Sequence, residues 1–407
     1  MNQPALVAPR PGDDALERRL ARVCGFVDAY LDVVLDDDSD RAAKAACEVA
    51  LFARHLGMLG VRVDWARAIG ARLVPRLRGV GVIQRLVWTP SRAGMLGVGH
   101  ALLRDLGLPD PAWDRVIDRL TRHALAECRE LSPYEALEID WMLGLLGGAP
   151  RPGPRGPTAI ERAFDPLALL SDDAYAFTHA VFYATDFGRR PLPAEAAAVV
   201  ADRADAGAAW SLARGDYDLI GEFVLAARAA GAPLGPSARL ALAALDTTWD
   251  ELGFVPDHAM AGLAPEPARA DLFFAIYHAN LVAGLATASL RAAPATDGDE
   301  RAVSGHERDD LAATLAATMP SARAHAIAAA TPAWVAPRAT ADLRVHQAVH
   351  QRDLFAVVRA LAATRGLPSS ATDAAARIWL TEFGAAIVDL ELPGARDLIA
   401  LTDYATR

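Results

Sequence analysis

The chain has 407 residues, of which 53% are hydrophobic and only 7% aromatic, and its formal net charge at pH 7 is −10. The acidic balance argues against a nucleic-acid-binding surface, which needs clustered Lys and Arg side chains. The length suffices for two or three ordinary domains or for one large repetitive domain.

The sequence carries no sign of secretion or of membrane insertion. Its N-terminus lacks the charged segment and apolar core of a signal peptide, and no uninterrupted apolar run reaches the ~20 residues that span a bilayer. The cysteines show no CxxC spacing, so we expect Cys24, Cys47 and Cys128 to be buried thiols. We therefore expect a cytoplasmic protein that contacts neither membranes nor nucleic acid, with its oligomeric state left open.

The residue types favour helices throughout. Ala, Leu and Arg dominate and lose little side-chain entropy in a helix, whereas alternating β-branched runs and hairpin turns are missing from the sequence. Acidic residues at helix starts and Gly or Pro at helix ends set the expected boundaries. The first expected helix runs from 13 to the acidic residues at 36–40, and the others cover 41–57, 62–78, 92–106, 111–130, 133–147, 159–170, 172–186, 193–213, 217–230, 236–249, 267–290, 309–318, 320–330, 339–365, 370–390 and 394–405.

One segment predicts a domain boundary. Residues 149–158 contain four prolines and two glycines, the composition of a linker. We expect a flexible tail at 1–12, an N-terminal helical domain at 13–148 and a C-terminal domain of α-hairpin repeats at 159–407. Within the latter, the polar and acidic segment 291–309 predicts a mobile loop.

A glycine followed two residues later by proline closes several expected helices. Glycine suits the left-handed C-terminal cap, and the proline stops the helix from continuing. The spacing of these glycines fits multiples of a unit of ~41–45 residues, which is the size of one helical hairpin. They are Gly107, Gly148, Gly231 and Gly366.

The repeat extends upstream of these glycines. Tyr134-Glu135, Tyr217-Asp218 and Arg352-Asp353 align with one another, each pair ending 13 residues before its glycine. Repeated hairpins of this kind predict an all-α fold of stacked antiparallel helices. We expect it to close into an α/α toroid, with an open α-solenoid as the alternative.

The helix expected at 172–186 carries polar groups along one stripe. Asp172, Tyr175, His179, Phe182 and Asp186 fall on one line at helical spacing. The other faces are apolar, so the helix should be buried, where carboxylates and an imidazole are costly without partners. Asp172, Tyr175, His179 and Asp186 are therefore candidate catalytic residues.

A second helix repeats the pattern. Asp271, Phe274 and His278 stand at the same offsets, and Tyr277 precedes the second histidine. In a closed toroid both histidines would converge on one interior cavity, with Asp271, Tyr277 and His278 lining a ligand pocket. The alternative is that Asp and His satisfy each other within separate cores, and that the repetition records a duplicated packing solution.

Two carboxylates lie on the helix between these two. Asp218 and Glu222 share a face at i, i+4, and we count both among the ligand-pocket residues. Glu222 with His179 and His278 would form a set of two histidines and one carboxylate, which binds a divalent metal such as non-haem iron. The alternative is that acids at a helix N-terminus stabilise the helix dipole.

Two other patterns have plainer explanations. His346 and His350 are spaced to bind zinc on a helix, but no Glu follows the first histidine as in HExxH, and a polar exposed or lining face explains them. Asp36, Asp37 and Asp40 match the DDxxD box of class I terpene synthases over five residues only. A solvated helix cap explains them.

The segments YAFTHAVFYATDFG (175–188) and DLFFAIYHANLVAGLA (271–286) resemble an uncharacterised all-helical family of high-GC, actinobacteria-like bacteria, over about residues 160–390. By fold analogy alone, α/α toroids host cyclases, glycan-processing enzymes and zinc-dependent ring-forming enzymes. The resemblance implies no particular chemistry. Our first hypothesis is an enzyme or small-ligand-binding protein of bacterial specialised metabolism with an interior His/Asp site. The alternative is a helical-repeat scaffold that binds other proteins and has no catalytic activity.

Overall fold

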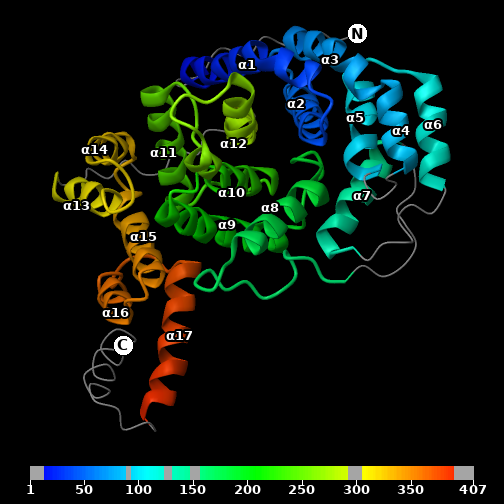
Figure 1. The fold of residues 1–407 in the computed structure, drawn as a ribbon. Coiled ribbons are helices and arrows are strands. Elements are labelled where there is room, and N and C mark those ends of the chain that lie inside the picture. Colours follow the sequence, from blue (N-terminus) through cyan, green and yellow to red (C-terminus); the bar gives the residue numbers. More distant parts are fainter. Residues whose placement is uncertain (1–12, 89–92, 123–130, 147–155, 292–304, 389–407) are drawn as a thin grey trace, which may run out of the picture. The chain divides into compact units, whose positions relative to one another are not determined.

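Every regular element of the described chain is helical, as the sequence predicts. The structure is a computed structural model, and it describes residues 13–88, 93–122, 131–146, 156–291 and 305–388. A short 3-10 helix, η2 (His258–Gly262), joins α11 to α12. The α-helices are α1 (Asp13–Asp36), α2 (Asp40–Met58), α3 (Val63–Leu77), α4 (Val80–Trp88), α5 (Ala93–Asp105), α6 (Pro111–Arg122), α7 (Pro133–Leu145), α8 (Ser171–Thr185), α9 (Ala194–Arg214), α10 (Tyr217–Ala229), α11 (Pro236–Leu252), α12 (Arg269–Arg291), α13 (Gly305–Leu315), α14 (Ser321–Ala330), α15 (Ala336–His350), α16 (Leu354–Ala362) and α17 (Ala371–Val388) (Figure 1).

The chain divides into two compact units. Unit 1 comprises residues 1–129, 142–148 and 264–294, and unit 2 comprises residues 130–141, 149–263 and 295–407. Unit 1 therefore takes α12 from the middle of the chain. The expected boundary at 149–158 lies mostly outside the described residues, as does most of the expected loop at 291–309, although α13 already begins at 305.

Unit 1 is built around α1, α2 and α12. Leu20, Val23 and Leu31 lie on one face of α1 and are fully buried, because they recur at helical spacing. α12 packs against both α1 and α2. A Cβ on Gly284 of α12 would come within 3.0 Å of Val23 and closer still to Phe52, so glycine there permits the close approach of the helices.

Among the described residues, α12 is the one helix long and apolar enough to cross a membrane by length and composition. The candidate span is Arg269–Leu290, and 78% of its 18-residue apolar window is buried inside the protein. Burial to that extent is what the core helix of a water-soluble protein shows, so its apolar sequence is explained by packing.

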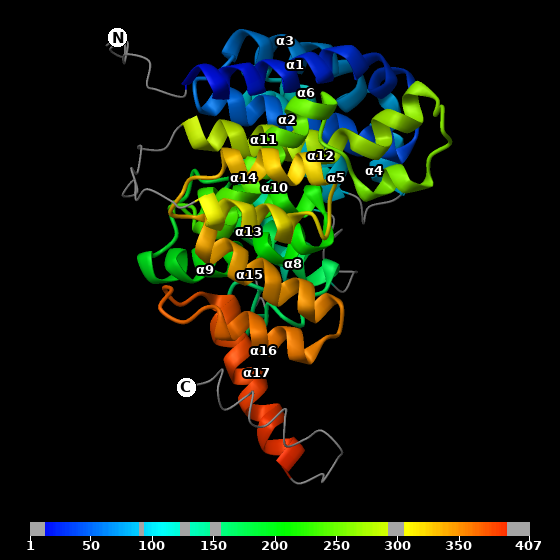
Figure 2. The ribbon, with the colours of Figure 1, turned by 90° about the vertical axis from the view of Figure 1, so that its left-hand side faces the viewer.

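Unit 2 is centred on α9, α10 and α11, which pack against one another (Figure 1). Phe223 of α10 occupies the space that a Cβ on Gly207 of α9 would fill. α15 packs against α9, α13 and α16, and α13, α15 and α16 follow one below another in the turned view (Figure 2).

Three of the predicted glycine caps are confirmed. Gly107, Gly231 and Gly366 have φ angles of 82°, 78° and 81°, the left-handed conformation that glycine adopts without strain. Gly148 lies outside the described residues. The closed toroid and the open solenoid both stay predictions, and so does the regular repeat.

Other boundaries differ from the prediction. α4 was not expected, the segment expected to be helical at 159–170 forms turns, and the helix expected at 339–365 is two helices, α15 and α16. The helix expected at 394–405 lies outside the described residues.

A buried carboxylate joins α9 to α11 in unit 2. Asp205 accepts a hydrogen bond of 2.8 Å from the backbone N–H of Ala238, at the start of α11. Burial, aided by the nearby charge of Asp342 and opposed in part by hydrogen bonds from the backbone, raises the pKa of Asp205 to about 7. Asp342 is itself buried and paired with Arg338.

We predict that Asp205→Asn removes a pH-dependent loss of stability. The native state holds the Asp205 proton up to about pH 7, whereas the unfolded chain releases it near pH 3.8. The free energy of unfolding therefore falls as pH rises between these values, by up to about 4 kcal/mol for a shift of ~3 pKa units. Asn keeps the acceptor but cannot ionise, so the variant should gain stability over wild type from pH 5 to pH 8 in urea unfolding.

Glu195→Gln is the matched control, because Glu195 is exposed on the same helix and its charge is not among those that raise the pKa of Asp205. It should leave the pH dependence of the unfolding free energy as in wild type. Equal slopes for wild type and Asp205→Asn would contradict the prediction.

Candidate functional site

Two helices of unit 2, α8 and α10, carry the candidate site. Phe177 of α8 stacks on Phe223 of α10 with ring centroids 6.0 Å apart, which fixes the spacing between the helices. The Asp216 side chain caps α10 by accepting a hydrogen bond of 3.1 Å from the backbone N–H of Leu219. The first turn of α10 therefore begins at a defined point beside α8.

The two carboxylates predicted on α10 are both buried. Asp218 is 2% exposed and Glu222 is 1% exposed, and each is held by a hydroxyl of α8. Tyr175 donates a hydrogen bond of 2.8 Å to Asp218 Oδ2, and the Thr178 hydroxyl donates to Glu222 Oε2. These bonds offset part of the cost of taking two carboxylates out of water.

His179 lies beside this pair. Its Nδ1 is 2.9 Å from the backbone carbonyl oxygen of Tyr175 and 3.6 Å from Glu222 Oε2. The carbonyl can only accept, so Nδ1 carries the proton in the neutral ring and Nε2 is the acceptor. The side chain is 26% exposed, which gives a ligand access to the imidazole.

Aromatic rings surround the imidazole of His179. Ring centroids of Phe182, Tyr183, Tyr175 and Tyr134 lie 5.7, 5.9, 6.0 and 6.3 Å from its own. Burial raises the pKa of Tyr175, and the charge and hydrogen bond of Asp218 raise it further, so its hydroxyl stays protonated and donates. The cluster of Tyr175, Thr178, His179, Asp218 and Glu222 is called the α8–α10 cluster below.

Asp186, predicted as catalytic, has contacts of a different kind. It ends α8 in the left-handed conformation with a φ of 49° and is 3% exposed. Trp141 donates a hydrogen bond of 2.7 Å from its indole Nε1 to Asp186 Oδ1, and Arg189 lies 3.2 Å from Oδ2. These contacts hold the end of α8 in place.

Asp172 is exposed in the first turn of α8, next to Asp173. The prediction that it lies on a buried stripe is therefore wrong, because the stripe leaves the core where the helix begins. Acidic residues in a first turn interact favourably with the helix dipole.

The predicted pocket residues of the second histidine helix belong to unit 1. His278 Nε2 lies 3.9 Å from Glu48 Oε1, and Tyr277 stacks on Phe273 at 5.2 Å. Asp271 is exposed and lies 3.9 Å from Arg41. The expectation that His278 shares a cavity with His179 stays a prediction.

The remaining histidine pair does not form one face. His346 is buried, its Nε2 lies 3.0 Å from Thr372 Oγ1, and burial lowers its pKa to about 3. His350 is exposed. In the acidic run, Ser39 caps α2 by accepting a hydrogen bond from the backbone N–H of Ala42, and the Asp37 carboxylate accepts one from the N–H of Ser39.

Two residues of the site escaped the sequence analysis. Thr178 was missed because a threonine inside a helix usually bonds to its own backbone, and its hydroxyl is also 3.2 Å from the Ala174 carbonyl oxygen. Tyr134 lies on α7, and its alignment with Tyr217 was the one signal that singled it out.

We predict that Asp186 acts through stability. Asp186→Ala leaves the Trp141 indole N–H without its acceptor and places alanine in a left-handed conformation, so the free energy of unfolding should fall by about 2–4 kcal/mol. Asp186→Asn, which keeps an acceptor and tolerates this conformation, should lose about 1 kcal/mol. Urea unfolding measures both.

Arg189→Ala is the control for the ion pair. Its side chain is 51% exposed, so the loss should stay below about 0.5 kcal/mol. If Asp186→Ala cost no more than this control, a structural role for Asp186 would be ruled out.

Searches of curated proteins and of solved structures found no match. The family model described as "Domain of unknown function (DUF6895)" matches residues 27–288. The match begins in α1, contains the whole α8–α10 cluster and ends in α12, so it starts and stops earlier than the resemblance expected at about 160–390. Because it covers more than half of the sequence, the chain belongs to the DUF6895 family, an uncharacterised domain family.

Proposed function

We propose that the α8–α10 cluster binds a divalent cation together with a small organic ligand, and that the protein is an enzyme or a small-ligand-binding protein. The observation that carries the proposal is the pair Asp218 and Glu222. Both carboxylates are almost fully buried, they stand one helical turn apart, and a partly exposed imidazole lies 3.6 Å from Glu222. Carboxylate oxygens and imidazole are common ligands of Mn²⁺, Fe²⁺ and Zn²⁺.

The hydroxyls of α8 act as orienting groups in this proposal. Tyr175 and Thr178 each donate to one oxygen of a carboxylate, which holds its plane in a fixed direction. Groups that orient metal ligands in this way typically change metal affinity by about 10–100-fold when removed.

His179 supplies the proton chemistry. With Nδ1 bonded to the Tyr175 carbonyl oxygen, Nε2 accepts a proton from a bound ligand. Glu222 then stabilises the imidazolium that forms after proton transfer. The aromatic rings around His179 suit the apolar part of an organic ligand.

The wider setting of the proposal rests on the sequence. The composition resembles that of proteins from high-GC bacteria, and on that likeness we propose a role in bacterial specialised metabolism, in the cytoplasm. His278 remains a proposed further metal ligand. The scaffold alternative predicts that no metal or small molecule binds at the α8–α10 cluster.

We predict that Glu222→Gln and Asp218→Asn each weaken the binding of Mn²⁺ or Zn²⁺ at least about tenfold, because each removes one anionic ligand. Thr178→Val should weaken it by about tenfold, the low end of the range for an orienting group. Isothermal titration of untagged, metal-free protein measures the dissociation constants, and circular dichroism checks that each variant is folded.

Asp173→Asn is the matched control, because it removes an exposed carboxylate from α8. It should bind metal as wild type does. Metal-free isolation together with no heat of Mn²⁺ or Zn²⁺ binding would overturn the cation proposal, and His278→Ala measured in the same way decides whether that residue is a ligand.

A further inference from the structure

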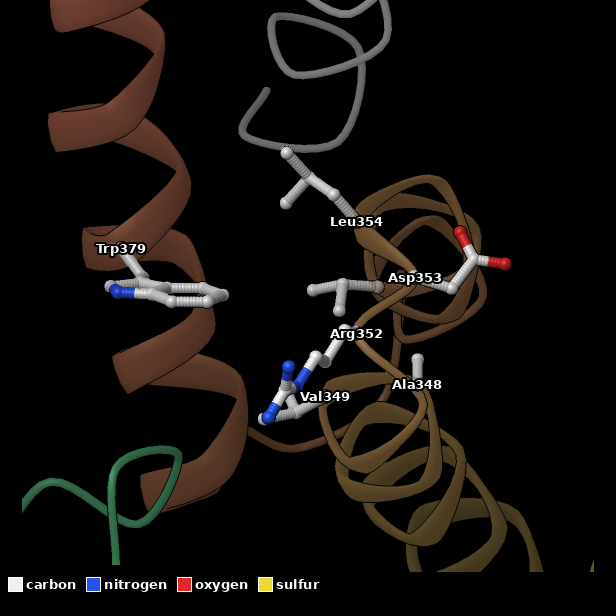
Figure 3. A pocket seen from close by; sticks show the side chains of 7 residues that line it. Ala348, Val349, Arg352, Asp353, Leu354 and Trp379 are labelled. Carbon is white, nitrogen blue, oxygen red and sulfur yellow. The ribbon is translucent and has the colours of Figure 1, made fainter.

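A cavity of unit 2 lies far along the chain from the α8–α10 cluster. It is formed where α15 ends and α16 begins, and α17 closes its other side (Figure 3). Its volume is about 190 Å³. The lining residues are Ala348, Val349, Arg352, Asp353, Leu354, Val357 and Trp379.

Arg352 holds an unusual backbone conformation at this cavity, with a φ of 58°. Its N–H donates to the carbonyl oxygen of Val349 at 3.0 Å, and the N–H of Asp353 donates to that of Ala348 at 2.9 Å. This pair of bonds is the Schellman motif that ends helices, and its left-handed position is normally glycine.

The turn between α9 and α10 shows the same motif with the usual residue. The N–H of Gly215 donates to Leu212, and the N–H of Asp216 donates to Ser211, at 3.1 and 3.0 Å. In both turns the next residue is an aspartate whose side chain caps the following helix, Asp216 for α10 and Asp353 for α16. Arg352 thus stands where this chain uses Gly215.

A left-handed conformation costs a residue with a Cβ roughly 1–2 kcal/mol. Such strain at a cavity indicates a use for the side chain. The Arg352 guanidinium points into the space between the α15–α16 turn and Trp379, whereas the Asp353 carboxylate points away from it (Figure 3). Asp353 is occupied by its capping bond to Ala356 and lies 3.7 Å from Arg359.

The remaining walls are apolar. Val349 and Leu354 lie opposite the Trp379 indole (Figure 3), and Val357 also lines the cavity. Among the described residues, no hydrogen bond or ion pair engages the Arg352 guanidinium. A cavity of ~150 Å³ holds benzene, so this one accommodates a single ring with a small substituent.

We propose that this cavity binds a small aromatic carboxylate, with its ring against Trp379 and its carboxylate on the fork of Arg352. The planar guanidinium matches a carboxylate with two parallel hydrogen bonds. The proposal is independent of the α8–α10 cluster, and the cavity lies beyond residue 288, where the family match ends.

The test uses 4-fluorobenzoate and its neutral analogue 4-fluorobenzamide, titrated into the full chain and followed by ¹⁹F NMR. Wild type should bind 4-fluorobenzoate saturably, with a dissociation constant of about 1 mM or below. Arg352→Gly should weaken this binding about 10–100-fold through loss of a charge-assisted bond. The benzamide should bind wild type as weakly as the benzoate binds the variant.

The glycine variant should fold at least as well as wild type, because glycine suits the left-handed position. Its melting temperature should therefore not fall, which separates loss of binding from loss of folding. Arg359→Ala, which removes an exposed charge from α16, the helix that follows the turn (side chain 65% exposed), should leave the dissociation constant unchanged within about twofold.

Three results would overturn the proposal. The first is the absence of saturable binding up to about 20 mM 4-fluorobenzoate. The second is equal affinity of wild type and Arg352→Gly. The third is a loss of affinity in Arg359→Ala as large as that in Arg352→Gly, which would show that only general charge attraction is involved.

Discussion

The packing of Phe223 against Gly207 is the contact on which the candidate site depends. Because no Cβ stands at Gly207, the Phe223 ring lies directly on the backbone of α9. Its other neighbour is the Phe177 ring of α8. This stack sets α8 close enough to α10 for the hydroxyls of one helix to reach the carboxylates of the other, and a side chain at 207 would push α10 away from α9.

That spacing makes the burial of acids tolerable. A carboxylate removed from water must be hydrogen-bonded, paired with a cation or protonated, and unit 2 shows all three solutions. Asp218 accepts from a tyrosine hydroxyl, Asp342 pairs with Arg338, and Asp205 keeps its proton up to about pH 7. Asp218 and Glu222 are distinct in lying beside a partly exposed imidazole, which is why we place function there.

The all-α fold class and several helix caps were predicted correctly from the sequence, because helix formation and capping depend on residues that are close together in the chain. Ser39 caps α2 after the acidic run, as expected. The segment at 159–170 failed because Pro166 cannot donate within a helix, and the Asp165 side chain instead bonds the N–H of Leu167. α4 was missed because the glycine-containing segment after residue 78 was taken as a break between helices, although Gly81 lies in the first turn of α4.

The site was predicted in part. His179, Glu222 and Asp218 do come together, since helical spacing put each on an inward face. Asp172 faces solvent, because periodicity does not show where along its length a helix enters the core. Asp186 ends its helix in a left-handed conformation, which the sequence pattern did not predict. Its carboxylate there accepts a hydrogen bond from Trp141.

The upstream alignment of the repeat shows the same limit at Arg352-Asp353. Sequence paired these residues with Tyr217-Asp218, whereas the hydrogen bonds pair them with Gly215-Asp216, two residues earlier. This change of alignment by two residues matters because it shows that Arg352 occupies a position where glycine is normally found, at an energetic cost. A turn that needs only its backbone is satisfied by glycine, as at Gly215. An arginine in the same turn adds a guanidinium at the mouth of an apolar cavity, and that difference is the physical basis for assigning the cavity a ligand.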